Sequence, residues 1–183
     1  MDYTVTYPCV KLRYFFSNMA LHVDSDAAYL VQPNKYSRIA GYYFLRTYPF
    51  PPPAIPQPAP NAPIVVECKT LHIVLASATE AEMGGLFHNG QTIIHVSWLI
   101  EALGHSQPPT PLKTNNSTSN AFVNKSLRQK KSKSWDMKFH WLRDKQNNKH
   151  LGVFWDQGSR NGADYFTKHH PAPYHKLKRL KYI

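Results

Sequence analysis

The stretch that most constrains the fold is LHVDSDAAYL (residues 21–30), which places two carboxylates in an otherwise apolar, strand-like segment. Side chains alternate between the two faces of a strand, so Asp24 and Asp26 should share one face. Leu21 and Val23 should line the opposite face. Because a buried carboxylate without a partner is costly, we expect a positive group next to these two acids.

The overall charge favours a polyanionic partner. The 183 residues include 22 Lys and Arg but only 11 Asp and Glu, a formal net charge of +11. Nucleic acid is the leading partner class for such a chain, and a basic domain that is merely soluble is the alternative. Hydrophobic residues make up 42% of the chain, which is typical of a folded domain.

The two cysteines and the hydropathy bear on location. Cys9 and Cys68 are too few for a disulfide framework and form no metal-binding motif, so we expect a reducing, intracellular setting, cytoplasmic or nuclear. The sequence contains neither a secretory signal nor an apolar run of membrane-spanning length, so no membrane partner is predicted.

The order of elements favours an α/β (α+β) mixed sheet flanked by helices. Alternation, helical spacing and turn residues predict five strands, over residues 21–31, 37–48, 64–77, 110–116 and 150–158, and helices over 77–104, 117–129, 134–146 and 161–170. Residues 47–63 contain eight prolines and predict a stiff exposed loop, with docking through a PxxP motif as the alternative.

The first helix has a recognisable start. Ser77 and Glu80 form a capping-box pattern. Gly84, Gly85 and Gly90 weaken the helix or, alternatively, let it approach the sheet closely.

Three acids from distant segments are candidate metal ligands. Asp26 lies on the first strand, Glu82 in the first turn of the first helix, and Asp164 near the start of the last helix. Together they could hold Mg²⁺, which prefers oxygen ligands. Each also has a structural alternative: Glu82 suits a helix N-terminus, Asp164 a cap, and Asp26 an ion pair with arginine.

Five runs in series carry a family resemblance. The runs LHVDSDAAYL, ATEAEMGGLF, PPTPLKTNNST, QKKSKSWDMKFHWLRD and GADYFTKHHP resemble the ribonuclease H domain of Copia-type LTR retrotransposon Pol polyproteins over residues 12–173. The resemblance implies a ribonuclease H-like fold with a five-stranded mixed sheet. It identifies residues 1–11 as a remnant of the connection after reverse transcriptase and leaves 174–183 as a basic C-terminal tail.

The resemblance also implies four acidic ligands for two Mg²⁺ ions, three of which match Asp26, Glu82 and Asp164. The remaining ligand should be the aspartate of a TDN motif, but the chain has Asn115 there. The implied activity is hydrolysis of RNA in RNA/DNA hybrids during reverse transcription, impaired by Asn115, with Mn²⁺ as a partial substitute for Mg²⁺. A catalytically inactive remnant that only binds nucleic acid is the alternative. The reverse transcriptase domain of the same polyprotein is a further implied partner.

A basic segment is the candidate nucleic-acid surface. Its cations and one aromatic side chain suit a phosphate backbone and base stacking, while a solvated charge run or a nuclear-targeting signal is the alternative. The residues are Lys125, Arg128, Lys130, Lys131, Lys133, Trp135 and Lys138. Trp98, Trp141 and Trp155 fall at apolar positions and are predicted to lie in the core.

Overall fold

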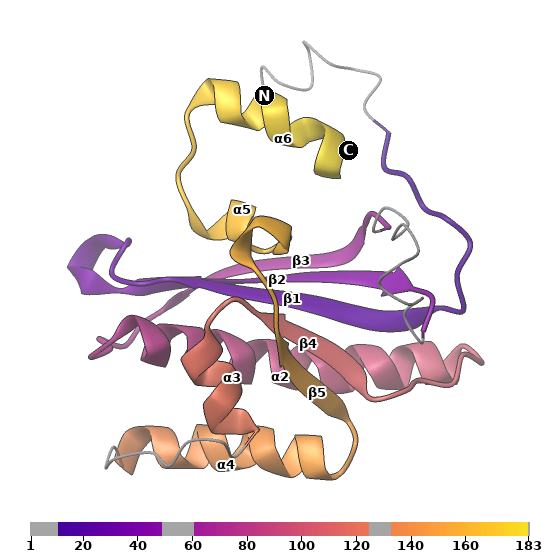
Figure 1. The fold of residues 1–183 in the computed structure, drawn as a ribbon, viewed down its shortest axis with the longest axis horizontal. Helices are drawn as coiled ribbons and strands as arrows, with labels where there is room; N and C mark the ends of the chain where they lie inside the picture. The colour runs from indigo at the N-terminus through magenta and orange to yellow at the C-terminus, as the bar shows by residue number, and fades with distance from the viewer. Residues whose placement is uncertain (1–10, 49–60, 125–132, 183) are drawn as a thin grey trace.

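A five-stranded mixed sheet runs through the centre of the molecule (Figure 1). The structure is a computed structural model that describes residues 11–48, 61–124 and 133–182. The strands follow the order β3-β2-β1-β4-β5. Strand β2 is antiparallel to both β1 and β3, and β4 is parallel to both β1 and β5. Their bounds are β1 Ala20–Ala28, β2 Ser37–Arg46, β3 Pro63–Leu71, β4 Thr110–Thr114 and β5 Leu151–Trp155. The predicted mixed sheet is therefore confirmed, although β3 ends six residues earlier than expected.

Helices cover both faces of this sheet (Figure 1). One face carries α2 (Ala78–Ala102), with α3 (Ser117–Val123) and α4 (Lys133–Asn147) beyond it. The other carries α5 (Asp164–Thr167) and α6 (Ala172–Tyr182), and two short 3₁₀ turns, η1 (Pro33–Lys35) and η2 (Gly158–Arg160), lie in loops. Helix α6 occupies most of the segment that the sequence predicts to be a basic tail. Among the described residues, no helix is both long and apolar enough to cross a membrane.

The central strand β1 separates an apolar face from an acidic one, as its alternation predicts. Leu21 and Val23 join the main core beneath α2. Asp24 and Asp26 are buried on the opposite face, under the segment that carries α5. A smaller apolar cluster on that second face consists of Ala40, Tyr42, Phe44, Ala163 and Phe166.

The start of α2 is fixed by its cap and by close packing on β1. The Ser77 hydroxyl accepts from the Glu80 backbone N–H at 3.2 Å, and the Glu80 carboxylate accepts from the Ala76 N–H at 2.8 Å. A Cβ atom at Gly85 would lie 3.3 Å from the Ser25 hydroxyl oxygen. The glycine therefore allows the helix to approach the sheet closely, which brings the first turn of α2 next to Asp26.

A buried amide locks α2 onto the two central strands. The Asn89 side chain donates to the Ser25 hydroxyl at 2.8 Å and to the Ala40 carbonyl at 3.0 Å, and it accepts from the Tyr43 hydroxyl at 3.0 Å. All of these groups are buried, so the loss of any of these bonds would leave an unsatisfied polar atom in the core.

Two of the three tryptophans predicted in the core lie at the surface. The side chains of Trp98 and Trp155 are 58% and 47% exposed, whereas Trp141 packs against the main core. Apolar spacing did not distinguish the buried ring from the exposed ones, because Trp98 lies on the outer side of a long helix and Trp155 at the end of β5.

Gly41→Ala should destabilise the fold by about 1–3 kcal/mol, because the new methyl group overpacks the buried amide site. Its Cβ would lie 2.4 Å from Asn89 Oδ1 and 2.6 Å from a Tyr43 ring carbon. Gly152→Ala is the matched control, since no heavy atom lies within 4 Å of its Cβ. Urea unfolding of both variants measures the difference, and equal stabilities would contradict this account.

Candidate active site

Asp24 is held by an internal ion pair. The Lys113 Nζ atom of β4 lies 2.9 Å from Asp24 Oδ1, and the Gly162 backbone N–H donates to Asp24 Oδ2 at 2.7 Å. Lys113 also donates to the Arg160 carbonyl at 2.8 Å. The positive group that the sequence predicts beside the two acids is therefore Lys113, and Asp24 serves to join β1, β4 and the loop before α5.

Asp26 receives hydrogen bonds on both oxygens and is only 2% exposed. The Asn115 amide donates to Oδ1 at 3.0 Å, and the Thr167 hydroxyl donates to Oδ2. Burial raises the pKa of Asp26, and the bond from Thr167 opposes that shift. Residues from the end of β4 and from α5 thus meet on this one carboxylate.

Glu82 lies in the first turn of α2 and is 7% exposed. Burial raises the pKa of Glu82 to about 8, the charge of Asp26 adds to the effect, and a backbone hydrogen bond from Ala27 opposes it. Its Oε2 atom is buried and has no hydrogen-bond partner among the described residues. The carboxyl is therefore largely protonated at neutral pH when no cation is bound.

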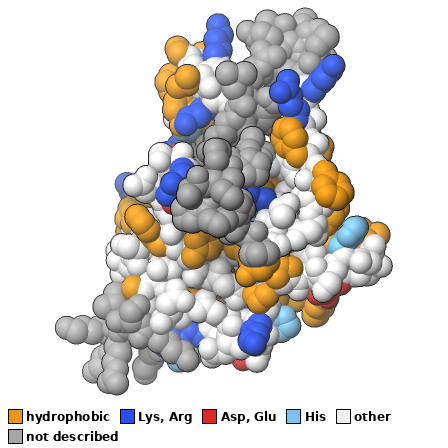
Figure 2. All heavy atoms as spheres, turned by 45° about the vertical axis from the view of Figure 1, so that its right-hand side comes forward, with side chains coloured by type: hydrophobic (Ala, Val, Ile, Leu, Met, Phe, Trp, Pro, Cys, Tyr) orange, Lys and Arg blue, Asp and Glu red, His pale blue; other side chains and the backbone are white. Residues whose placement is uncertain are grey.

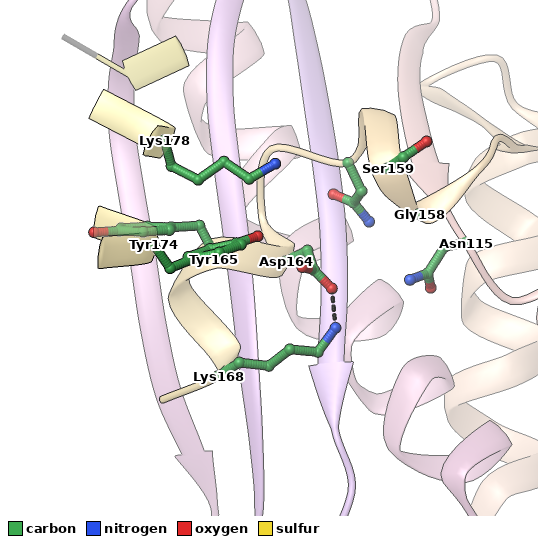
Figure 3. Close-up of a pocket in the computed structure, with 9 residues that line it drawn as sticks. Asn115, Gly158, Ser159, Asp164, Tyr165, Lys168, Tyr174 and Lys178 are labelled. Carbon is green, nitrogen blue, oxygen red and sulfur yellow. Dashed lines mark hydrogen bonds and ion pairs between the residues drawn. The ribbon is translucent and has the colours of Figure 1, made fainter. Parts of the chain in front are cut away.

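Asp164 opens α5 and pairs with a lysine one turn later. The Asn161 amide anchors the preceding loop, because it donates to the Ser25 carbonyl at 2.8 Å and accepts from the Ala163 N–H at 3.0 Å. The Lys168 ammonium then bonds to the Asp164 carboxylate (Figure 3). Partial burial alone would lower the pKa of Lys168, but the bond to Asp164 and the charges of Asp164 and Asp26 raise it.

Asn115 is positioned by the strand beside it. The indole N–H of Trp155 donates to the Asn115 backbone carbonyl at 3.1 Å, and a Cβ at Gly158 would lie 3.3 Å from the Asn115 amide nitrogen. Sequence reasoning missed Trp155, Thr167 and Lys168 as parts of this site. Thr167 and Lys168 do lie in the FTK run that follows Asp164, but no local pattern shows that they reach Asp26 or its neighbours.

The four predicted site residues come from β1, α2, β4 and α5. Asn115 contacts Asp26 directly, and the charges of Asp26 and Asp164 both raise the pKa of Glu82. In the described part of the chain, however, no group of three or more His, Cys, Asp or Glu side chains is arranged to hold a metal ion. The oxygen donors suit Mg²⁺ in kind, and Oε2 of Glu82 is available, but the chain's own donors occupy Asp26 and Asp164.

The predicted nucleic-acid surface is described only at one residue. Lys125, Arg128, Lys130 and Lys131, and the side chains of Lys133 and Trp135, lie outside the described residues. Lys138 is half-buried, and its Nζ lies 5.7 Å from the centre of the Phe87 ring. On the face shown in Figure 2, Lys and Arg side chains are more prominent than Asp and Glu, in keeping with the excess of positive charge.

Comparison with known proteins shows similarity in three dimensions only. No family model matches the sequence, and no curated protein matches it either. The N-terminal RNase H domain of Rv2228c from Mycobacterium tuberculosis superposes with a TM-score of 0.55 at 8% identity, covering 81% of this chain and 91% of that one. LC11-RNase H1, solved in complex with an RNA/DNA hybrid, gives 0.53 at 10% identity, with 80% and 92% covered.

The chain has a ribonuclease H-like fold. It is also similar to part of the foamy viral protease-reverse transcriptase, solved in complex with an RNA/DNA hybrid, with a TM-score of 0.51 at 12% identity. There 86% of this chain matches 21% of that protein. Identities this low establish the fold alone.

Between pH 6.5 and 8, we expect the free energy of unfolding to fall as the pH rises. The folded state, with the pKa of Glu82 raised to about 8 from its ordinary 4.5, keeps a proton that the unfolded chain has already released. The effect of His22, whose pKa burial lowers to about 3 from its ordinary 6.5, has the opposite sign; it is largest below pH 6.5 and fades above it. Urea unfolding across this range measures the slope, and Glu82→Gln should flatten it. A slope that persists in that variant would assign it to another group.

Proposed function

We propose that this chain is a retrotransposon-type ribonuclease H domain that binds RNA/DNA hybrids and hydrolyses the RNA strand slowly with divalent cations. The observation that carries the proposal is the meeting of Asp26, Glu82 and the Asp164 loop around the end of β1, with Asn115 bonded to Asp26. The similarity to hybrid-bound ribonuclease H structures supports the substrate class.

The proposal extends to partners and location. A reverse transcriptase domain of the same Copia-type polyprotein is the proposed neighbour, supported by the match to part of a foamy viral protease-reverse transcriptase. The proposed setting is reducing and intracellular, in the cytoplasm or nucleus; this agrees with Cys68, an exposed free thiol.

The carboxylates of Asp26, Glu82 and Asp164 would hold the cations. A pair of Mg²⁺ ions, when bound, would activate the attacking water and stabilise the leaving oxygen at the scissile phosphate. To take part, Glu82 must release its proton, and Asp164 must give up its bond to Lys168. Asn115 adds a neutral amide where a fourth carboxylate would offset the cost of dehydrating Mg²⁺.

Hybrid binding without cleavage is the second candidate function. Its support is that three donors of the chain itself, the Asn115 amide, the Thr167 hydroxyl and the Lys168 ammonium, already satisfy Asp26 and Asp164. A cation would have to displace these groups, so its binding free energy must exceed the cost of breaking their bonds to Asp26 and Asp164. Both candidates predict hybrid binding, and they differ in turnover.

Asn115→Asp should raise the rate of Mg²⁺-dependent hybrid cleavage by at least about tenfold, because it returns one carboxylate to the cation site. It should also destabilise the metal-free protein, since the amide that donates to Asp26 at 3.0 Å becomes a second acid. Mg²⁺ or Mn²⁺ should then raise the unfolding temperature more in the variant than in the wild type. Cleavage of an end-labelled hybrid and thermal unfolding with and without cation measure both effects.

Asn116→Asp is the matched control for the added charge. Asn116 caps α3 by accepting from the Ser119 N–H at 2.9 Å, a role that aspartate can keep, so cleavage should stay at the wild-type level. Asp26→Asn in the Asn115→Asp background should abolish the gain. If Asn115→Asp is folded and binds hybrid but stays silent, the second candidate is correct. Strong cleavage by the wild type would show that the amide suffices.

Binding of a hybrid should weaken steeply with salt, because each neutralised phosphate contributes about 0.7–0.9 to the log–log slope. Changing Lys130, Lys131 and Lys133 together to alanine should flatten that slope if the predicted basic segment contacts the backbone. Fluorescence anisotropy of a labelled hybrid between 50 and 200 mM salt, about the range over which such contacts are lost, is the measurement. An unchanged slope would place the binding surface elsewhere.

A further inference from the structure

A cavity lies beside Asp164, between the end of β4, η2, α5 and α6 (Figure 3). Its volume is about 260 Å³, smaller than the roughly 300–1,000 Å³ of pockets for drug-sized ligands. Asn115 and Ser159 line one side of it, and Tyr165 and Tyr174 line the other. The cavity extends beyond the acid cluster of Asp26, Glu82 and Asp164, because α6 supplies part of its wall.

The cavity holds more positive than negative charge. Lys168 and Lys178 both line it, and in Figure 3 their side chains extend toward Asp164 from opposite sides. Asp164 is the one acid among the lining residues, and it pairs with Lys168. Among the described residues no carboxylate pairs with Lys178, whose Nζ lies 5.3 Å from the centre of the Tyr174 ring. Within the described part of the chain, the Lys178 ammonium therefore has no counter-ion in the cavity.

An aromatic stack holds α6 in the position that aims Lys178 inward. Tyr174 stacks on His170 with ring centres 4.2 Å apart, and His170 stacks on Tyr165 at 5.2 Å. The Tyr165 hydroxyl lies 2.5 Å from His175 Nδ1. Rings on α5, on α6 and in the turn between them thus fix the two helices together. Lys178 therefore projects into the cavity from a helix that is held in place by packing.

The neutral groups around the cavity suit an oxyanion. The Asn115 amide and the Ser159 hydroxyl line it together with the two ammonium groups. Hydroxyl and amide N–H groups donate to phosphate oxygens, and a lysine contributes a point charge. The volume accommodates a single phosphate with its sugar but not a folded macromolecular segment.

We propose that this cavity binds one phosphate group of a nucleic-acid strand, with Lys178 as its main cationic contact and with no metal ion required. A strand phosphate and free inorganic phosphate both present negatively charged oxygens to these groups. The choice of a strand phosphate rests on the proposed function. α6 would thereby add a phosphate contact on the face of the sheet opposite α2.

Lys178→Gln in the full chain tests the assignment. With EDTA present, the variant should bind a labelled RNA/DNA hybrid about three- to tenfold more weakly at low salt, and its log–log salt slope should be smaller by about 0.7–0.9. Lys178→Arg keeps the charge and should retain both values. Lys149→Gln is the control: this exposed lysine lies two residues before β5, whose other end adjoins Asn115, and the change should leave affinity and slope as in the wild type.

The outcomes separate this inference from the proposed hydrolysis. If Lys178→Gln binds hybrid with the wild-type affinity and slope, the assignment of a strand phosphate to this cavity is wrong even when the wild type cleaves hybrid. If the variant shows the loss but the wild type never cleaves, the assignment stands and the hydrolytic function fails. If the wild type binds no hybrid, both fall. If millimolar inorganic phosphate raises the unfolding temperature of the wild type but not of Lys178→Gln, while hybrid binding is equal in the two, the site takes free phosphate instead.

Discussion

The burial of two carboxylates on the central strand is the constraint on which the rest of this structure depends. Asp24 and Asp26 lie two residues apart on β1, and each needs partners from distant parts of the chain. Lys113 and the Gly162 N–H satisfy Asp24, while Asn115 and Thr167 satisfy Asp26. Removing one member of a buried charge pair costs about 3–5 kcal/mol. Separation of β4 from β1 would break such a pair, so the contacts of Asp24 strongly stabilise the attachment of β4 and of the loop before α5 to β1. The contacts that close the fold are therefore the contacts that assemble the acid cluster.

The acid cluster is balanced by groups of the chain itself. Carboxylates this close repel one another, and a bound cation is one way to relieve the repulsion. Here the Asn115 amide donates to Asp26, the Lys168 ammonium pairs with Asp164, and burial raises the pKa of Glu82 to about 8. The two candidate functions therefore differ in one quantity. Hydrolysis requires that the free energy of cation binding exceeds the cost of breaking these internal contacts, and binding without cleavage follows when it does not.

The sequence predicted those features of the fold that depend on neighbours along the chain. Alternation placed Leu21 and Val23 opposite Asp24 and Asp26, and the Ser77–Glu80 pattern located the start of α2. It also predicted a positive group beside the acids but could not name Lys113, because that pairing depends on the register of β4 against β1.

The roles of residues contributed by the C-terminal segment were harder to predict. Helix α6 begins beside two prolines and carries little apolar character, so its charges favoured a tail; the rings of Tyr165 and His170 that hold it become visible only in three dimensions. The apolar neighbours of Trp155 likewise predict a core position, but its side chain is exposed.

Asp164 belongs to the acid cluster and also lines the phosphate cavity, together with its partner Lys168. Binding of a phosphate and binding of a cation should therefore affect each other. Lys168 lines the cavity while it pairs with Asp164. A phosphate oxygen bound there would compete with the carboxylate for that ammonium and so leave Asp164 more available to a cation. Thermodynamic linkage is reciprocal, so a cation on Asp164 would equally release Lys168 toward the phosphate. If both sites act as proposed, binding of the nucleic acid raises the affinity of Asp164 for a cation. Without the strand, the ion pair between Lys168 and Asp164 lowers that affinity.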